Sequence, residues 1–230
     1  MRKKIVIGHR GAPSIKFENS LEGVVEALKL GVDGVEVDVR TTKEGIPIAF
    51  HDQTTSRILG IDKPVNEIGL DEIRCMGKIR GFTIPTIGGL LTVVSAETIL
   101  VLDVKEWRAV EMLADLLRHL SNRKIIIASF DHRIPLTIKK AVPWVKAGLI
   151  LSLRPLSLSR ITCENVDCVF VKKDYIDCEL LEEATSLGLD IYAWVVNDKE
   201  EAERLWSLGV CGVVTDTPQL FAIGGRRSWS

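Results

Sequence analysis

The chain has 230 residues, of which 46% are hydrophobic and 27% are charged, and its 30 basic and 31 acidic residues leave a formal net charge of -1. This composition is typical of a soluble globular protein that is long enough to bury a sizeable core. The near balance of charge excludes a strongly basic or acidic chain, so we expect no nucleic-acid partner and no anionic membrane partner.

The chain carries no evident targeting or membrane signal. The apolar run at residues 5–7 is shorter than the core of a signal peptide. No run approaches the roughly 18 apolar residues of a membrane helix. The five cysteines show no C-x-x-C spacing, which predicts reduced thiols and no zinc site. We therefore expect a cytoplasmic protein without stable membrane insertion, and the oligomeric state stays open between a monomer and a homo-oligomer.

Short β-branched runs alternate with longer amphipathic stretches along the chain. The first predicted strand, at 4–7, leads into His9-Arg10-Gly11, and a helix is predicted at 21–30, with Asn19 or Ser20 as its N-cap. Further strands are predicted at 34–39, 99–104, 125–129, 147–152, 168–171, 191–195 and 211–215. Further helices are predicted at 107–120, 135–141, 177–187, 198–208 and 218–222, with a short turn-helix near 156–161.

Two segments after the second strand do not fit this alternation. Residues 46–50 are predicted to form a short strand beside the second strand, and residues 53–82 form a polar insertion with one weak helix near 70–76. Eight strand–helix units remain, which predicts parallel strands closed into a (β/α)₈ TIM barrel with a small insertion. We expect residues 1–230 to form one domain. A doubly wound open sheet is the alternative, although no G-x-G-x-x-G follows the first strand.

Carboxylates occur on two neighbouring predicted strands, close to the carboxyl ends where barrel active sites lie. Glu36 and Asp38 are two residues apart, so their side chains point to the same face, roughly 6.5–7 Å apart at the backbone. Asp103 lies on the next strand. Hard divalent cations such as Mg²⁺ or Ca²⁺ prefer oxygen ligands of this kind. The pattern predicts a site for one divalent cation, and ion pairs with Lys105 or Arg10 are the alternative interpretation.

Two of the four histidines follow neighbouring strands. His9 and His51 suit a general base and a general acid that face each other across the mouth of the barrel. Arg10 suits a bidentate grip on phosphate oxygens, and Lys105 offers a point charge to the same anion.

Three other residues at this rim are typical of structural roles when each is taken alone. Trp194 can pack the top of the barrel. Asp52 points away from His51 if the chain is extended, and Asp216 can cap the last helix. We therefore expect Asp52 and Asp216 to be structural.

Several motifs follow one another in a distinctive order: His9-Arg10-Gly11, Glu18-Asn19-Ser20, Glu36-Val37-Asp38, His51-Asp52, Ile84-Pro85-Thr86, Asp103-Val104-Lys105, Trp194-Val195-Val196-Asn197 and Thr215-Asp216-Thr217-Pro218. This order resembles the glycerophosphodiester phosphodiesterase family over nearly the whole chain. The resemblance implies a TIM barrel that hydrolyses a small-molecule glycerophosphodiester to glycerol 3-phosphate and an alcohol with a divalent cation.

The resemblance also implies roles for single residues. His9 and His51 would be the acid–base pair, and Glu36 and Asp38 would hold the metal. Arg10 and Lys105 would hold phosphate, and Trp194 would flank the substrate. Asp103 and Gly88 stand where the family usually has Glu.

Three other functions remain open at this point. A barrel of the phospholipase C or D kind would need an apolar lip, for which Ile58, Leu59 and Phe82 are candidates. A sugar-phosphate isomerase would need no metal. A non-catalytic barrel would bind a phosphoester without cleaving it.

Overall fold

The protein is described by a computed structural model over residues 3–162 and 165–222. Within these residues the strands are β1 (Ile5–Gly8), β2 (Gly34–Thr41), β3 (Pro47–Ala49), β4 (Ile99–Val104), β5 (Ile125–Ser129), β6 (Lys146–Leu151), β7 (Cys168–Lys172), β8 (Asp190–Trp194) and β9 (Gly212–Thr215). They form one sheet in the order β1-β9-β8-β7-β6-β5-β4-β2-β3, and β1 also pairs with β2. All pairs are parallel except β2–β3. The predicted barrel is confirmed, and the open sheet is wrong.

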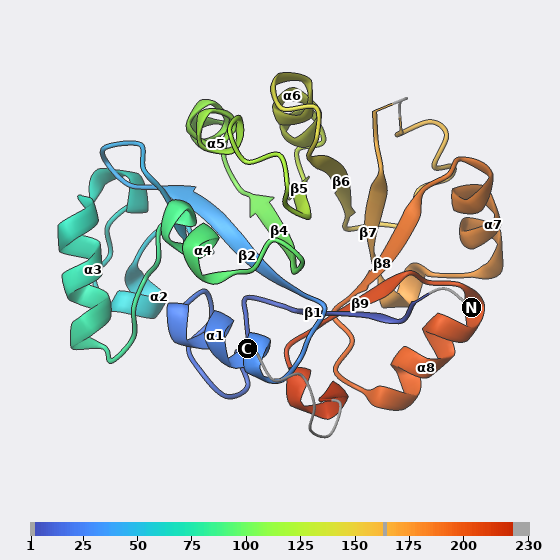
Figure 1. Cartoon of the computed structure of the whole chain (residues 1–230), viewed down its shortest axis with the longest axis horizontal. Helices are drawn as coiled ribbons and strands as arrows, with labels where there is room; N and C mark the ends of the chain where they lie inside the picture. Colours follow the sequence, from blue (N-terminus) through green and yellow to red (C-terminus); the bar gives the residue numbers. More distant parts are fainter. Residues whose placement is uncertain (1–2, 163–164, 223–230) are drawn as a thin grey trace.

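Helices lie around the outside of this barrel (Figure 1). Those outside the insertion are α1 (Leu21–Lys29), α4 (Ile87–Val93), α5 (Val110–Leu117), α6 (Arg133–Ala141), α7 (Cys178–Ser186) and α8 (Lys199–Leu208). Ser20 caps α1, because its side chain accepts a hydrogen bond from the backbone N–H of Gly23. The predicted helix at 107–120 is shorter, with a 3₁₀ turn (Trp107–Ala109) before α5, and the last predicted helix is a 3₁₀ helix (Pro218–Phe221).

The turn-helix predicted near 156–161 is wrong. The described residues there form bends and a turn, in which the Leu158 carbonyl accepts hydrogen bonds from the backbone N–H groups of Ile161 and Thr162. The Glu183 carboxylate on α7 accepts hydrogen bonds from the backbone N–H groups of Leu158 and Ser159. Those N–H groups are therefore held by a side chain from another element.

The insertion lies beside the barrel next to β2 (Figure 1), and its apolar residues pack with Ile48 of β3. It contains α2 (Ser56–Leu59), a 3₁₀ turn (Val65–Glu67) and α3 (Leu70–Ile79). It has a small apolar core of its own, formed by Ile48, Phe50, Leu59, Val65, Ile68, Ile73, Phe82 and Ile84. Leu59 and Phe82, two of the three candidates for an apolar lip, are only 4% and 5% exposed, whereas the third, Ile58, is half-buried.

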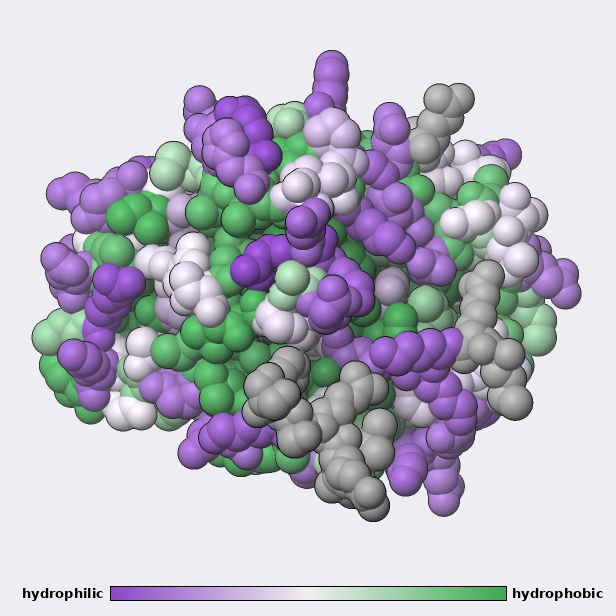
Figure 2. All heavy atoms as spheres, in the orientation of Figure 1, coloured by the Kyte–Doolittle hydropathy of each residue, from purple (hydrophilic) through white to green (hydrophobic). Residues whose placement is uncertain are grey.

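Alternation along the strands separates two apolar layers. On β2, Val35, Val37 and Val39 belong to the cluster shared with α1, α4, α5 and α6, so the residues between them point into the barrel. In the view of Figure 2, hydrophilic side chains project around much of the outline and many hydrophobic ones lie further in. No helix of the described chain is long and apolar enough to cross a membrane. Cys75, Cys168 and Cys178 are free thiols, and Cys163 lies outside the described residues.

The loop from β1 to α1 passes very close to the helix that follows it. Gly11 has φ +87°, and a Cβ placed on it would lie 2.6 Å from the carbonyl carbon of Gly23 in α1. Gly31 has a similar φ of +82° but nothing within 4 Å of such a Cβ. The two positions therefore differ in the space around them and hardly at all in backbone conformation.

We expect Gly31→Ala to lower the free energy of unfolding by roughly 1–2 kcal/mol, the usual cost of a left-handed conformation for a residue with a Cβ. Gly11→Ala should lower it further, because the backbone of α1 must also move. Urea denaturation of both variants measures the difference. Equal losses in the two variants would contradict the close contact at Gly11.

Candidate active site

Three carboxylates lie together inside the mouth of the barrel. Glu36 and Asp38 occupy inward positions on β2, and Asp38 is the register partner of Asp103 on β4. Their exposed fractions are only 6%, 1% and 6%. One carboxylate oxygen from each residue lies within 4.8 Å of those of the other two. This arrangement follows from the alternation of side chains along two adjacent parallel strands.

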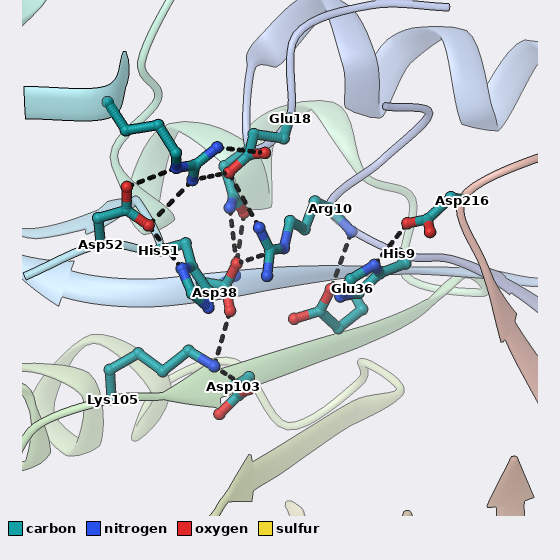
Figure 3. Close-up of polar contacts among 12 residues, drawn as sticks. His9, Arg10, Glu18, Glu36, Asp38, His51, Asp52, Asp103, Lys105 and Asp216 are labelled. Carbon is teal, nitrogen blue, oxygen red and sulfur yellow. Dashed lines mark hydrogen bonds and ion pairs between the residues drawn. The ribbon is translucent and has the colours of Figure 1, made fainter. Parts of the chain in front are cut away.

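Positive groups surround the middle carboxylate. The Asp38 oxygens lie 2.8 Å from Lys105 Nζ and 3.1 Å from Arg10 Nε, and Lys105 also contacts Asp103. The Asn19 side-chain amide donates a hydrogen bond of 2.7 Å to the Asp38 carboxylate, and its oxygen accepts one of 3.0 Å from the Asp38 backbone N–H. Figure 3 shows Lys105 reaching both aspartates. The ion pairs considered as an alternative therefore exist beside the carboxylate cluster.

Glu36 is in a different environment from its neighbour. It accepts a hydrogen bond of 2.8 Å from the backbone N–H of Arg10, and His9 Nε2 lies 3.9 Å away. Burial, together with the nearby charge of Asp38, raises the pKa of Glu36 to about 7. Burial opposes ionisation of Asp38 as well, but the charges of Lys105 and Arg10 outweigh it and lower the pKa of that group.

A cation would fit among these three carboxylates. Burial raises the pKa of Asp103, and its Oδ1 is buried with no hydrogen-bond partner among the described residues. A buried carboxylate oxygen in this state is unfavourable unless a positive group approaches it. The three side chains offer only oxygen atoms, which suits a hard cation. Glu36, Asp38 and Asp103 can therefore bind one metal ion.

Each histidine at the mouth is held by an aspartate. His9 Nδ1 lies 2.7 Å from Asp216 Oδ1, and Asp216 is held in turn by Asn197. His51 Nδ1 lies 2.7 Å from Asp52 Oδ1. With Nδ1 engaged in this way, Nε2 of each ring remains available for proton transfer.

Two expectations about contacts are wrong: Asp52 does not point away from His51, and Asp216 does not cap the last helix. The chain leaves the extended conformation after β3, so Asp52 turns back toward His51. The side chain of Asp216 contacts His9, and the last 3₁₀ helix has no side-chain cap at all. A His-Asp neighbour pair in the sequence was a signal for the first contact. The second joins residues 207 positions apart, and no local pattern could reveal it.

The eight residues expected at the site all line one cavity of about 160 Å³: His9, Arg10, Glu36, Asp38, His51, Asp103, Lys105 and Trp194. Apolar side chains also line the cavity, namely those of Val101, Ala128, Phe130, Ile150, Phe170 and Val214. Trp194 packs edge-on against Phe130 with 6.0 Å between the ring centroids. The cavity therefore has both charged and apolar lining.

Two residues with left-handed backbone conformation shape the loop that carries His9 and Arg10. Arg10 has φ +50° and Asn19 has φ +54°, a left-handed conformation that non-glycine residues adopt infrequently. The Asn19 backbone N–H donates to the Arg10 carbonyl at 3.0 Å. This closed loop aims the Arg10 side chain at Asp38 and Glu18 (Figure 3).

Comparison with known proteins identifies the family of the chain. The sequence model of the glycerophosphoryl diester phosphodiesterase family matches residues 9–110 and 92–220. The chain belongs to this family. Proteins of this family are phosphoric diester hydrolases. The resemblance indicated by the order of motifs is therefore confirmed.

Individual relatives agree with this family over almost the whole chain. A glycerophosphodiester phosphodiesterase of Caldanaerobacter subterraneus is 28% identical, and the match covers 94% of this chain and 96% of that protein. The crystal structure of a glycerophosphodiester phosphodiesterase from Thermotoga maritima is similar with a TM-score of 0.84 at 26% identity, covering 96% and 98% of the two chains.

A third structure is similar in fold. A phosphodiesterase from Oleispira antarctica, in complex with the product sn-glycerol-3-phosphate, has a TM-score of 0.86 at 24% identity, and the match covers 95% of each chain. At this level of identity the similarity concerns the barrel itself.

The raised pKa of Glu36 leads to a prediction about stability. In the unfolded chain Glu36 titrates near its usual value of 4.5, whereas its pKa in the fold is about 7. Between these values the folded state binds more protons, so the free energy of unfolding falls as the pH rises. We expect this fall in protein treated with EDTA, measured by urea denaturation at several pH values.

Two variants isolate the contribution of this group. Glu36→Gln should flatten the pH dependence between about 4.5 and 7. Glu111→Gln, on the exposed side of α5, should leave it unchanged. An identical slope in the wild type and in Glu36→Gln would contradict the assignment.

Proposed function

We propose that the protein is a metal-dependent glycerophosphodiester phosphodiesterase, which hydrolyses its substrate to glycerol 3-phosphate and an alcohol. The observation that carries the proposal is the pair of aspartate-held histidines that face a buried carboxylate cluster in one cavity. Family membership and relatives with this name support it. We also propose that residues 1–230 act as one domain, with 53–82 as its insertion.

In the proposed mechanism, the two histidines move the protons. The Nε2 of one ring takes a proton from the attacking hydroxyl, which belongs to water or to the substrate's own glycerol. A new phosphorus–oxygen bond forms and the ester bond to the alcohol breaks. The Nε2 of the other ring gives a proton to the leaving oxygen. If water attacks, this step releases glycerol 3-phosphate and the alcohol. If the glycerol hydroxyl attacks, a cyclic glycerol phosphate forms, and water opens it in a second step in which the now unprotonated ring takes a proton from water and the protonated ring gives one to the glycerol oxygen. His9 and His51 fill these two roles, and their order is left open.

Arg10 and Lys105 are proposed to bind the phosphate. Both already neutralise carboxylates at the cavity, so their charges lie where the phosphodiester oxygens would enter. Such preorganised charge stabilises the negative charge that develops in the transition state. Trp194 is proposed to flank the substrate, because its ring and that of Phe130 line the cavity.

We propose that Glu36, Asp38 and Asp103 hold one divalent cation, Mg²⁺ or Ca²⁺. When bound, this cation would offset the negative charge on the phosphate oxygens. Asp103, which is shorter than the glutamate common in the family, is supported as a ligand by its buried Oδ1 without a partner among the described residues.

A lipid substrate is the second candidate. The exposed apolar residues near the mouth, such as Leu153 (72% exposed) and Leu156 (94% exposed) in the segment after β6, favour it. Release of products from soluble glycerophosphodiesters and from lysophospholipids, compared at equal concentration, separates the two candidates. Faster release of products from lysophospholipids would favour the lipid substrate over the soluble one.

We expect His9→Ala and His51→Ala to fold but to lose turnover by about 10²–10⁴-fold each, the usual contribution of a general acid or base. Release of glycerol 3-phosphate measures the loss, and circular dichroism checks the fold. His119→Ala, at an exposed position on the outside of the barrel, is the control. A near-wild-type rate in either of the first two variants would overturn the acid–base assignment.

We also expect EDTA to abolish activity and Mg²⁺ or Ca²⁺ to restore it. Asp103→Asn should raise the cation concentration needed for half-maximal activity at least about tenfold, because it removes one charged ligand. The added cation should also raise the melting temperature of the wild type, and do so less for this variant. Asp115→Asn on α5 is the control. Full activity in EDTA would refute the metal site.

A further inference from the structure

Arg57 lies in α2 of the insertion, yet its guanidinium joins two carboxylates that each contact a residue lining the cavity. It donates to Asp52 through Nε and Nη2 at 2.6 and 2.9 Å. It also donates to Glu18, in the loop before α1, through Nη1 and Nη2 at 3.0 and 2.6 Å. Both pairs are bidentate, which is the geometry that fixes the orientation of a carboxylate most strictly.

Each of these carboxylates holds one residue of the proposed machinery. Asp52 engages His51 Nδ1 at 2.7 Å, and Glu18 accepts a hydrogen bond of 2.9 Å from Arg10 Nη1. Figure 3 shows Glu18 beside Arg10 and Asp52 beside His51. Arg57 is therefore one contact away from a proposed proton-transfer group and from a proposed phosphate-binding group at the same time.

The fold holds Arg57 in this place. Leu59 on the same short helix is buried in the core of the insertion, and its carbonyl accepts a hydrogen bond of 3.1 Å from Arg80 Nη2.

The Arg57 hydrogen bonds lower the pKa of Asp52 to about 2, so Asp52 stays an acceptor for His51 at any working pH.

The stability of the fold does not account for this arrangement. The side chain of Arg57 is 50% exposed, and ion pairs at such positions contribute only about 0–1 kcal/mol. The two contacts instead restrict the rotamers of two carboxylates, each of which restricts a residue at the cavity. Small displacements of residues that position a substrate or transfer a proton reduce reaction rates.

We propose that Arg57 is a positioning residue through which the insertion completes the active site. It orients His51 through Asp52 and Arg10 through Glu18. The inference rests on the proposed function, because it assigns Arg57 to the reaction that His51 and Arg10 serve.

The test compares Arg57→Met and Arg57→Lys with a matched control, Arg154→Met. Arg154 also joins two carboxylates, Asp177 and Glu179, but in the loop after β6. We expect kcat/KM to fall about 10- to 100-fold in Arg57→Met. Arg57→Lys should recover only part of it, because an ammonium cannot bind both carboxylates in a bidentate manner. Arg154→Met should stay near the wild type, with a melting temperature like that of Arg57→Met.

Nitrogen NMR of the His51 ring gives a readout that needs no activity. In the wild type the neutral ring should carry its proton on Nδ1, toward Asp52, and Arg57→Met should shift it toward a mixture of tautomers. Arg154→Met should leave this spectrum unchanged.

These readouts separate the inference from the proposed function. A wild type that releases no product with any cation defeats the proposed function, while the His51 spectrum still tests the arrangement around Arg57. If Arg57→Met matches Arg154→Met in both kcat/KM and the His51 spectrum, the inference is overturned.

Discussion

The central constraint on this protein is the burial of three carboxylates on one side of the barrel mouth. Parallel pairing of β2 with β4 places Asp38 directly beside Asp103, with Glu36 two residues earlier. Charges held this close and this deep repel one another unless positive groups approach them. Lys105 and Arg10 provide such groups, and Asn19 adds hydrogen bonds to Asp38. Arg10 and Asn19, both in the left-handed conformation, are the loop residues that make these contacts.

A second layer of contacts surrounds the first. Asp216 and Asp52 hold the two histidines, and Arg57 and Asn197 hold these aspartates. The residues of this layer come from the insertion and from the segments that follow β3, β8 and β9. A barrel brings such distant segments to one rim because all its parallel strands end there.

Much of the architecture could be predicted from local patterns. The strands were found within a residue or two, since β-branched runs and alternating helices are strong signals. The helix α4 was not predicted, because Gly88 and Gly89 are poor helix formers, and only the cap at Thr86 and packing against its neighbours stabilise it. Near 156–161 the chain forms a turn, and its Leu158 and Ser159 backbone N–H groups are held by the distant carboxylate of Glu183.

The sequence by itself determined the barrel and eight of the residues that line its cavity, because strand alternation and the order of motifs are local properties. Only the tertiary structure decided which groups hold those residues. The contacts of His9 with Asp216, and of Arg57 with Glu18 and Asp52, depend on how loops from separate strands meet. Side-chain geometry across such loops is set by packing in three dimensions, and spacing along the chain carries little information about it.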